Sequence, residues 1–266
     1  RAYLEFARGL NTGLMSGWFT QENYFNQDLN EASATVRFAL PNGGYWERLI
    51  DRPSRFGKMK ARFKPKYSAQ GFWWCPPTVD LATVEEIWIV EGIFDAISLS
   101  QNNIAAVSAM SSNVYPAHAL EELVALRKGN LPRLVWALDN EPTARKYLQR
   151  WVRQSRELGF KCVAALIPQR DGRKVDWNDL HQRWQFEEGE KRDQRRKRDL
   201  EVARHEGDLL LAASPREKAM LMYTWEDATS EFCLEFGNRM YWARFDLSKL
   251  EEEQREILNS DDHDDQ

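Results

Sequence analysis

Four short apolar runs, separated by helix-sized stretches, constrain the fold of this chain more than any other feature of its sequence. The runs are Ile87–Val90, Ile104–Val107, Leu134–Leu138 and Cys162–Ile167. Strands that alternate with helices pair in parallel, because a crossover of helical length returns the chain to the same end of the sheet. Uninterrupted apolar character indicates strands buried on both faces. The sequence therefore predicts an α/β fold with a parallel sheet flanked by helices.

The character of the chain changes twice along its 266 residues, which predicts three parts. Residues 1–80 mix strand-like runs with turns, including a hairpin whose turn is PNG, and end in the prolines of GFWWCPP. Residues 81–184 hold the four apolar runs. Residues 185–266 open with a run of mixed charge, predicted as a solvated helix or linker. After this run the sequence predicts a hairpin that turns at Gly237–Asn238, then a terminal helix and an acidic tail.

Composition narrows the class of protein. No apolar run is long enough to span a bilayer and no signal peptide is recognisable, so the expected location is the cytoplasm, with no membrane partner. Three widely spaced cysteines fit neither a disulfide framework nor a zinc site. The formal net charge is −4, yet residues 52–66 carry seven Lys or Arg and no acid. This basic stretch predicts a local anion site, and a solvated loop is the alternative.

Acidic residues follow three of the four apolar runs. Glu91 comes directly after the first, Asp139 and Glu141 follow the third, and the motif DWND supplies Asp176 and Asp179 after the fourth. Because the carboxyl ends of parallel strands share one edge, we expect these acids to converge. Carboxylates about 4 Å apart repel by about 4 kcal/mol at an effective dielectric of 20, so the cluster favours a bound cation. Oxygen-only ligands favour Mg²⁺ or Mn²⁺, and acids scattered on solvated loops are the alternative.

Two residues next to Glu91 have predicted supporting roles. Gly92 lets a phosphate or a metal approach the backbone. Asp95 follows one helical turn later, where it supports the site or favours a helix N-terminus.

In the order and placement of these motifs the sequence resembles the Toprim family, a metal-binding domain shared by bacterial-type primases, topoisomerases, recombination proteins and some nucleases. Glu91–Gly92 matches the family's glutamate–glycine pair after its first strand. Asp139 and Glu141 match its Asp-x-Asp after a later strand, with glutamate in place of the second aspartate. Residues 176–179 resemble a further acidic motif of the primase branch.

Residues 1–80 resemble the small basic α/β subdomain that precedes the Toprim domain in bacterial-type primases. PKYSAQG carries the Pro-Lys-Tyr signature, whereas GGYWERL stands where the family usually has Gly-Gly-Arg. The cations that the resemblance implies at the nucleotide phosphates or the template are Arg37, Arg48, Lys60, Arg62, Lys64 and Lys66. The whole resembles primase-like proteins of phages and other mobile genetic elements.

These resemblances imply a DNA primase, a nucleotidyltransferase that copies single-stranded DNA into short RNA primers. The implied catalytic residues are Glu91, Asp139, Glu141 and Lys66, and the implied ligands of two Mg²⁺ or Mn²⁺ ions are Glu91, Asp139, Glu141, Asp176 and Asp179. Expected partners are the template, ribonucleoside triphosphates and a replicative helicase. Two alternatives stay open. One is a Toprim nuclease. The other is a catalytically silent module that binds DNA or a helicase, and the glutamate at position 141, in place of the family's second aspartate, favours this one.

Overall fold

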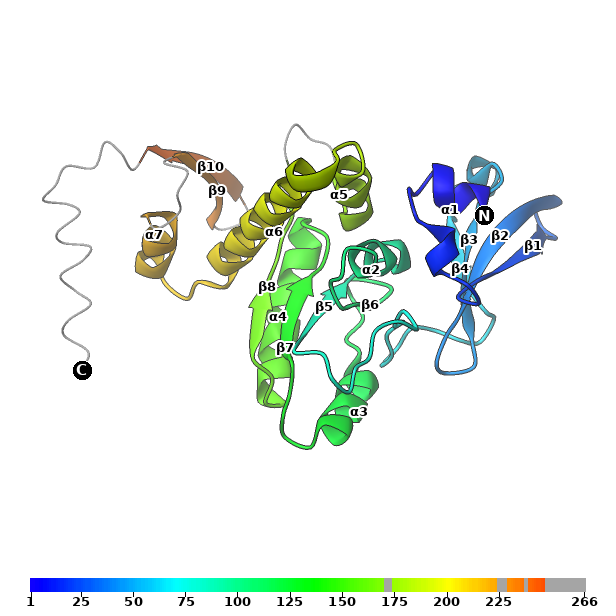
Figure 1. Cartoon of the computed structure of the whole chain (residues 1–266), viewed down its shortest axis with the longest axis horizontal. Helices are drawn as coiled ribbons and strands as arrows, with labels where there is room; N and C mark the ends of the chain where they lie inside the picture. The colour runs from blue at the N-terminus through cyan, green and yellow to red at the C-terminus, as the bar shows by residue number, and fades with distance from the viewer. Residues whose placement is uncertain (170–173, 224–228, 237–238, 247–266) are drawn as a thin grey trace, which may run out of the picture. The chain divides into compact units, whose positions relative to one another are not determined.

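The computed structural model describes residues 1–169, 174–223, 229–236 and 239–246. The contacts group the chain into two units, Arg1–Gly207 and Asp208–Gln266. The first unit contains an antiparallel and a parallel sheet (Figure 1). The two boundaries predicted from the sequence, near residues 80 and 184, stay a prediction.

The four apolar runs form the four strands of the parallel sheet. These are β5 (Glu86–Val90), β6 (Ala106–Ser108), β7 (Arg133–Ala137) and β8 (Cys162–Ala164), in the order β6-β5-β7-β8. Val90 pairs with Ala137, so the two central strands, β5 and β7, end level with each other. The predicted α/β fold with a parallel sheet is confirmed.

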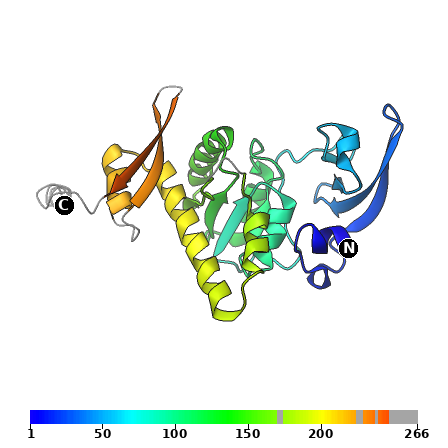
Figure 2. The ribbon, with the colours of Figure 1, turned by 90° about the horizontal axis from the view of Figure 1, so that it is seen from above.

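Helices cover both faces of this sheet, which explains why its strands are apolar throughout. The helices are α2 (Ile93–Ser100), α3 (Ala117–Arg127), α4 (Pro142–Glu157) and α5 (Trp177–Trp184). On one face Trp88 of β5 packs edge-on against Trp177, with ring centroids 5.2 Å apart. On the other face Trp136 of β7 stacks on Tyr115, which contacts Trp151 of α4. Figure 2 shows the sheet between these two layers.

The N-terminal sheet is antiparallel and follows the chain order. Its strands are β1 (Thr20–Asn26), β2 (Glu31–Ala39), β3 (Tyr45–Leu49) and β4 (Ala61–Phe63), accompanied by α1 (Ala2–Phe6) and the 3-10 helices η1 (Thr12–Leu14) and η2 (Pro53–Phe56). The predicted hairpin is β2–β3, in which Ala39 pairs with Tyr45. Phe38 and Trp46 contact Phe94 of α2 from one face of the sheet. The two sheets of the first unit therefore share one core.

Helix α6 (Gly189–Leu211) forms where the run of mixed charge predicts a helix. It is not solvated all round, because Ala203 is fully buried and its carbonyl accepts a hydrogen bond of 2.7 Å from the amide of Leu166. A Cβ at Gly207 would collide with the carbonyl of Ala164. The glycine lets the helix backbone approach the end of β8, which an alternation of charges does not predict.

The described part of the second unit contains α7 (Pro215–Tyr223) and an antiparallel pair, β9 (Thr229–Phe236) with β10 (Arg239–Asp246). The pair confirms the predicted hairpin, whose turn at Gly237–Asn238 lies outside the described residues. The predicted terminal helix and acidic tail lie outside them too. No helix within the described ranges combines the length and the apolar character needed to cross a bilayer.

Candidate active site

The acids after β5 and β7 lie where the strand order reverses. From β5 the chain adds β6 on one side and then crosses to β7 on the other side of β5. Such a reversal opens a crevice beyond the carboxyl ends of the two strands, where ligands of open α/β sheets bind. Glu91 follows β5 directly, and Asp139 follows β7 after Leu138. The fold thus brings these two predicted residues to neighbouring positions at that edge.

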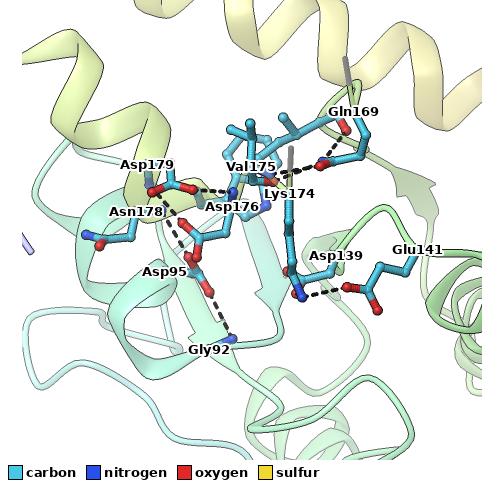
Figure 3. A network of polar contacts seen from close by, with 12 residues as sticks. Gly92, Asp95, Asp139, Glu141, Gln169, Lys174, Val175, Asp176, Asn178 and Asp179 are labelled. Carbon is cyan, nitrogen blue, oxygen red and sulfur yellow. Dashed lines mark hydrogen bonds and ion pairs between the residues drawn. The ribbon is translucent and has the colours of Figure 1, made fainter. Parts of the chain in front are cut away.

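Lys174 joins Asp139 to Glu141 (Figure 3). Its ammonium lies 2.7 Å from Oδ2 of Asp139 and 2.7 Å from Oε1 of Glu141. Glu141 is the N-cap residue of α4, and Pro142 at the first helical position fixes where the helix begins. Burial acts to lower the pKa of the ammonium, but its two carboxylate partners outweigh burial and raise the pKa. Two acidic side chains therefore already converge on one cation.

The carboxyl of Glu91 has a raised pKa because it is buried and lies near these two acids. Burial raises the pKa of its carboxyl to about 7, with the charges of Asp139 and Glu141 adding to the effect and Lys174 opposing it. The backbone carbonyl of Glu91 accepts a 2.9 Å hydrogen bond from the hydroxyl of Ser108, which holds the end of β5 beside β6. A carboxyl with a pKa near neutrality in a crevice is typical of a functional site.

Asp95 explains the glycine next to Glu91. Its buried carboxylate accepts hydrogen bonds from the amides of Gly92 (3.1 Å) and Asn178 (3.0 Å). A Cβ at position 92 would collide with this carboxylate, whereas the φ of −97° there suits any residue. Burial, together with the charges of Asp176 and Asp139, raises the pKa of Asp95 well above its usual range. The space beside Gly92 is thus filled by Asp95, which caps α2 and ties it to α5 (Figure 3).

Asp176 and Asp179 cap the N-terminus of α5 reciprocally. Asp176 accepts a 2.8 Å hydrogen bond from the amide of Asp179, and Asp179 accepts one of 3.1 Å from the amide of Asp176. Burial raises the pKa of Asp176, although the hydrogen bond from the Asp179 amide acts to lower it. This capping box accounts for the DWND motif as a helix start. The role of both residues as metal ligands stays a prediction.

The donor chemistry at the strand ends fits a divalent cation. In the described ranges no three His, Cys, Asp or Glu side chains are arranged as a ready metal site. Asp139 and Glu141 nevertheless direct one oxygen each at the ammonium of Lys174, which occupies the place of a cation. Glu91 feels the charge of both. Carboxylate oxygens are the ligands that Mg²⁺ and Mn²⁺ prefer.

Two of the predicted phosphate-binding arginines contact a buried acid. The carboxylate of Glu47 on β3 is fully buried and lies 2.9 Å from the guanidinium of Arg37 on β2 and 2.7 Å from that of Arg62 on β4. Thr35 donates a further hydrogen bond of 3.1 Å to it. The three charged residues form one row because Glu47 pairs with Arg37 and with Arg62 across the sheet. Both arginines keep about a quarter of their side chains exposed.

The remaining predicted cations are dispersed. Arg48 lies on the opposite face of β3 from Glu47, and its buried Nε has no hydrogen-bond partner among the residues that the structure describes. Lys64 donates to the carbonyl of Gly43 and lies over the ring of Tyr67. Lys60 and Lys66 are exposed. Arg48 therefore does not join Arg37 and Arg62 on one surface.

Sequence reasoning missed two cations beside the acidic cluster. Lys174 stands two residues before the DWND motif, a proximity that could have suggested a link to the acids. Arg8 donates to Asn178 at 3.4 Å, covers the ring of Phe94 and acts to lower the pKa of Asp176. No sequence signal connects Arg8 with residues 170 positions away.

Comparisons with known proteins give one family match and two similar solved structures. A family model described as Toprim-like matches residues 88–181. Two solved structures are similar. One is the RNA polymerase domain of the primase DnaG of Mycobacterium tuberculosis, with a TM-score of 0.49 and 15% identity, over 76% of this chain and 67% of that one. The other is that domain in complex with double-stranded DNA, with a TM-score of 0.46 and 17% identity, over 70% and 61% of the two chains. A search of curated proteins found no significant match.

The family match begins in β5 and ends in α5, so it includes all the acids at the ends of the parallel strands: Glu91, Asp95, Asp139, Glu141, Asp176 and Asp179. It confirms the resemblance stated from Glu91–Gly92 and from Asp139 with Glu141. Residues 88–181 form a Toprim-like domain.

Proposed function

We propose that this chain is the catalytic core of a DNA primase, which synthesises short RNA primers on a single-stranded DNA template. The observation that supports it best is the convergence of Asp139 and Glu141 on one cation, beside a Glu91 whose pKa is raised, at the reversal of strand order in a Toprim-like domain. Acids gathered at one point give a fold no stability and suit the binding of Mg²⁺ or Mn²⁺.

In this proposal Asp139 and Glu141 hold the metal, with Glu91 beside them and Asp176 or Asp179 assisting. Bound divalent cations would activate the primer 3′-hydroxyl and neutralise charge on the pyrophosphate leaving group. The chain's own contribution is position and charge. Burial raises the pKa of Glu91 to about 7 in the chain without a metal, so a cation bound beside it would favour release of its proton.

The basic residues of the N-terminal sheet would hold the triphosphate and the template. Lys66 and Lys60 are exposed and can reach a phosphate directly. Arg37 and Arg62 would act as oriented cations, because Glu47 fixes their guanidinium groups. Such contacts release counter-ions, so template affinity would fall as salt concentration rises. A replicative helicase is the proposed protein partner and the cytoplasm the proposed place of action.

A primer-synthesis assay tests the proposal. The protein is incubated with single-stranded DNA, labelled ribonucleotides and Mg²⁺ or Mn²⁺, beside the variants Asp139→Asn and Lys66→Ala. We expect Asp139→Asn to reduce primer yield by about a hundredfold or more, the usual cost of removing a charge at the reacting centre. Lys66→Ala should reduce it about tenfold, through a lost charged contact. Asp28→Asn and Lys161→Ala, which change exposed residues outside the acidic cluster and the basic stretch 52–66, are the matched controls.

The other outcomes identify the alternative functions. If the unmodified chain shortens the DNA and Asp139→Asn does not, the protein is a nuclease. DNA binding without product, unchanged by Asp139→Asn, would identify a silent binding module. Either result contradicts primer synthesis.

A further inference from the structure

We propose that Lys174 is a built-in counter-ion, which a divalent cation must displace from Asp139 and Glu141, so that this lysine sets the metal affinity of the site. The inference rests on the proposed metal-binding function and adds a residue that controls it. Neither the Toprim-like match nor the sequence motifs assign Lys174 a role.

The ammonium of Lys174 uses the oxygens that a metal would need. It lies 2.7 Å from Oδ2 of Asp139 and 2.7 Å from Oε1 of Glu141, and those contacts neutralise one of the two negative charges. A divalent cation would neutralise both charges and would need the same oxygens as ligands. Lysine and metal therefore compete for the same position.

The backbone that follows Lys174 is fixed by hydrogen bonds, and this positions the base of the lysine side chain. The amide of Val175 donates a 2.8 Å hydrogen bond to Oε1 of Gln169, and Nε2 of Gln169 donates one of 2.9 Å to the carbonyl of Val175 (Figure 3). Asp176 then begins α5 as its N-cap. Lys174 directly precedes these two anchored residues, and its side chain is directed at Asp139 and Glu141.

The ammonium can exchange with solvent from the Glu141 side. The side chains of Lys174 and Glu141 are each about half exposed, at 54% and 53%, whereas that of Asp139 is 12% exposed. The exposed pair with Glu141 is worth little, because water competes for both partners. A lysine side chain also has a flexible four-carbon stem, so its ammonium can turn into solvent without moving the backbone.

A Mn²⁺ titration tests the inference. Binding is followed by the electron paramagnetic resonance signal of free Mn²⁺, without nucleotide or DNA, for the unmodified chain, Lys174→Gln, Lys174→Arg and Lys161→Gln. Removing the competing charge should tighten Mn²⁺ binding to Lys174→Gln about tenfold, because the ammonium pairs with one exposed carboxylate, Glu141, and with one mostly buried carboxylate, Asp139. Lys174→Arg keeps the charge and should stay within about twofold of the unmodified chain. Lys161→Gln removes an exposed charge just before β8, at the other edge of the sheet, and should not alter binding.

A second measurement uses the unmodified chain and does not depend on the folding of a variant. Acetic anhydride acylates exposed amines, and mass spectrometry reports acylation of each lysine. Mn²⁺ should increase acylation of Lys174 severalfold and leave Lys161 unchanged, because displacement frees the ammonium.

The results separate this inference from the proposed function. Equal or weaker Mn²⁺ binding by Lys174→Gln, or acylation of Lys174 that Mn²⁺ does not alter, overturns the role of the lysine and leaves the metal site standing. Absence of Mn²⁺ binding in all four proteins overturns both. A measured increase in affinity supports the counter-ion even if no primer is made.

Discussion

At the scale of single residues, one buried carboxylate decides how two of the predicted phosphate-binding arginines can act. Glu47 has no exposed side-chain surface and is surrounded by Arg37, Arg62 and Thr35. A buried charge is stable only when it is paired and hydrogen-bonded. Arg37 and Arg62 therefore stabilise the N-terminal sheet, and only the part of each guanidinium that Glu47 leaves free can meet a phosphate.

Replacing this carboxylate should destabilise the protein. Glu47→Gln keeps the shape but weakens its hydrogen bonds to two cations, and we expect the free energy of unfolding to fall by about 2 to 3 kcal/mol. Urea denaturation followed by circular dichroism measures the change. Glu22→Gln is the control, because Glu22 is 39% exposed and lies 3.9 Å from Arg37, so its loss should cost less than about 0.5 kcal/mol. Equal effects of the two variants would contradict the role of burial.

At the scale of elements, Glu86 connects three segments of the first unit. This residue opens β5 and forms ion pairs with Arg133 of β7 and Arg204 of α6, each at 2.5 Å. The indole of Trp88 donates a further hydrogen bond of 2.8 Å. Burial acts to raise the pKa of Glu86, but Trp88 and the two arginines outweigh it and the pKa is lowered.

The direction of this shift predicts a pH dependence of stability. A carboxyl whose folded pKa is lowered stabilises the fold above its ordinary pKa of 4.5, and the contribution disappears as pH falls toward the folded value. We therefore expect the difference in unfolding free energy between the unmodified chain and Glu86→Gln to shrink from pH 6 to pH 3, read from urea midpoints. Glu85→Gln, at an exposed neighbour, should show a constant difference. A difference for Glu86→Gln that does not depend on pH would refute the assignment.

Elements of the parallel sheet could be predicted from the sequence better than the contacts around its acids. Strands buried on both faces leave an apolar run, and acids directly after such runs, such as Glu91 and Asp139, reach the ligand edge by topology alone. The contact of Lys174 with Asp139 could not be predicted, because Lys174 lies outside the helices and strands and the spacing of apolar residues does not show where its side chain lies. The sequence indicates that position 92 needs a residue without a side chain, and the structure gives one reason for this: the carboxylate of Asp95, from the next helical turn, fills the space beside Gly92.

At the scale of the whole molecule, the predicted boundary near residue 80 crosses a shared core. Phe38 of β2 is fully buried and its ring lies 6.0 Å from that of Phe94 in α2 and 5.4 Å from that of Trp74. The backbone of Trp74 pairs with Ser108 of β6, which links the segment before the boundary to the parallel sheet. The N-terminal sheet therefore buries Phe38 against residues that pack on the parallel sheet.

Phe38→Ala should therefore destabilise both sheets together. A fully buried phenylalanine contributes about 3 to 5 kcal/mol, through lost transfer free energy and the cavity left behind. Hydrogen exchange read by mass spectrometry should lose protection equally in peptides from β2–β3 and from α2, and urea unfolding should keep one transition. Phe25→Ala, at a side chain 54% exposed on β1, should change neither. Loss of protection confined to β2–β3 would show that residues 1–80 fold as an independent domain, because a shared core cannot be opened from one side only.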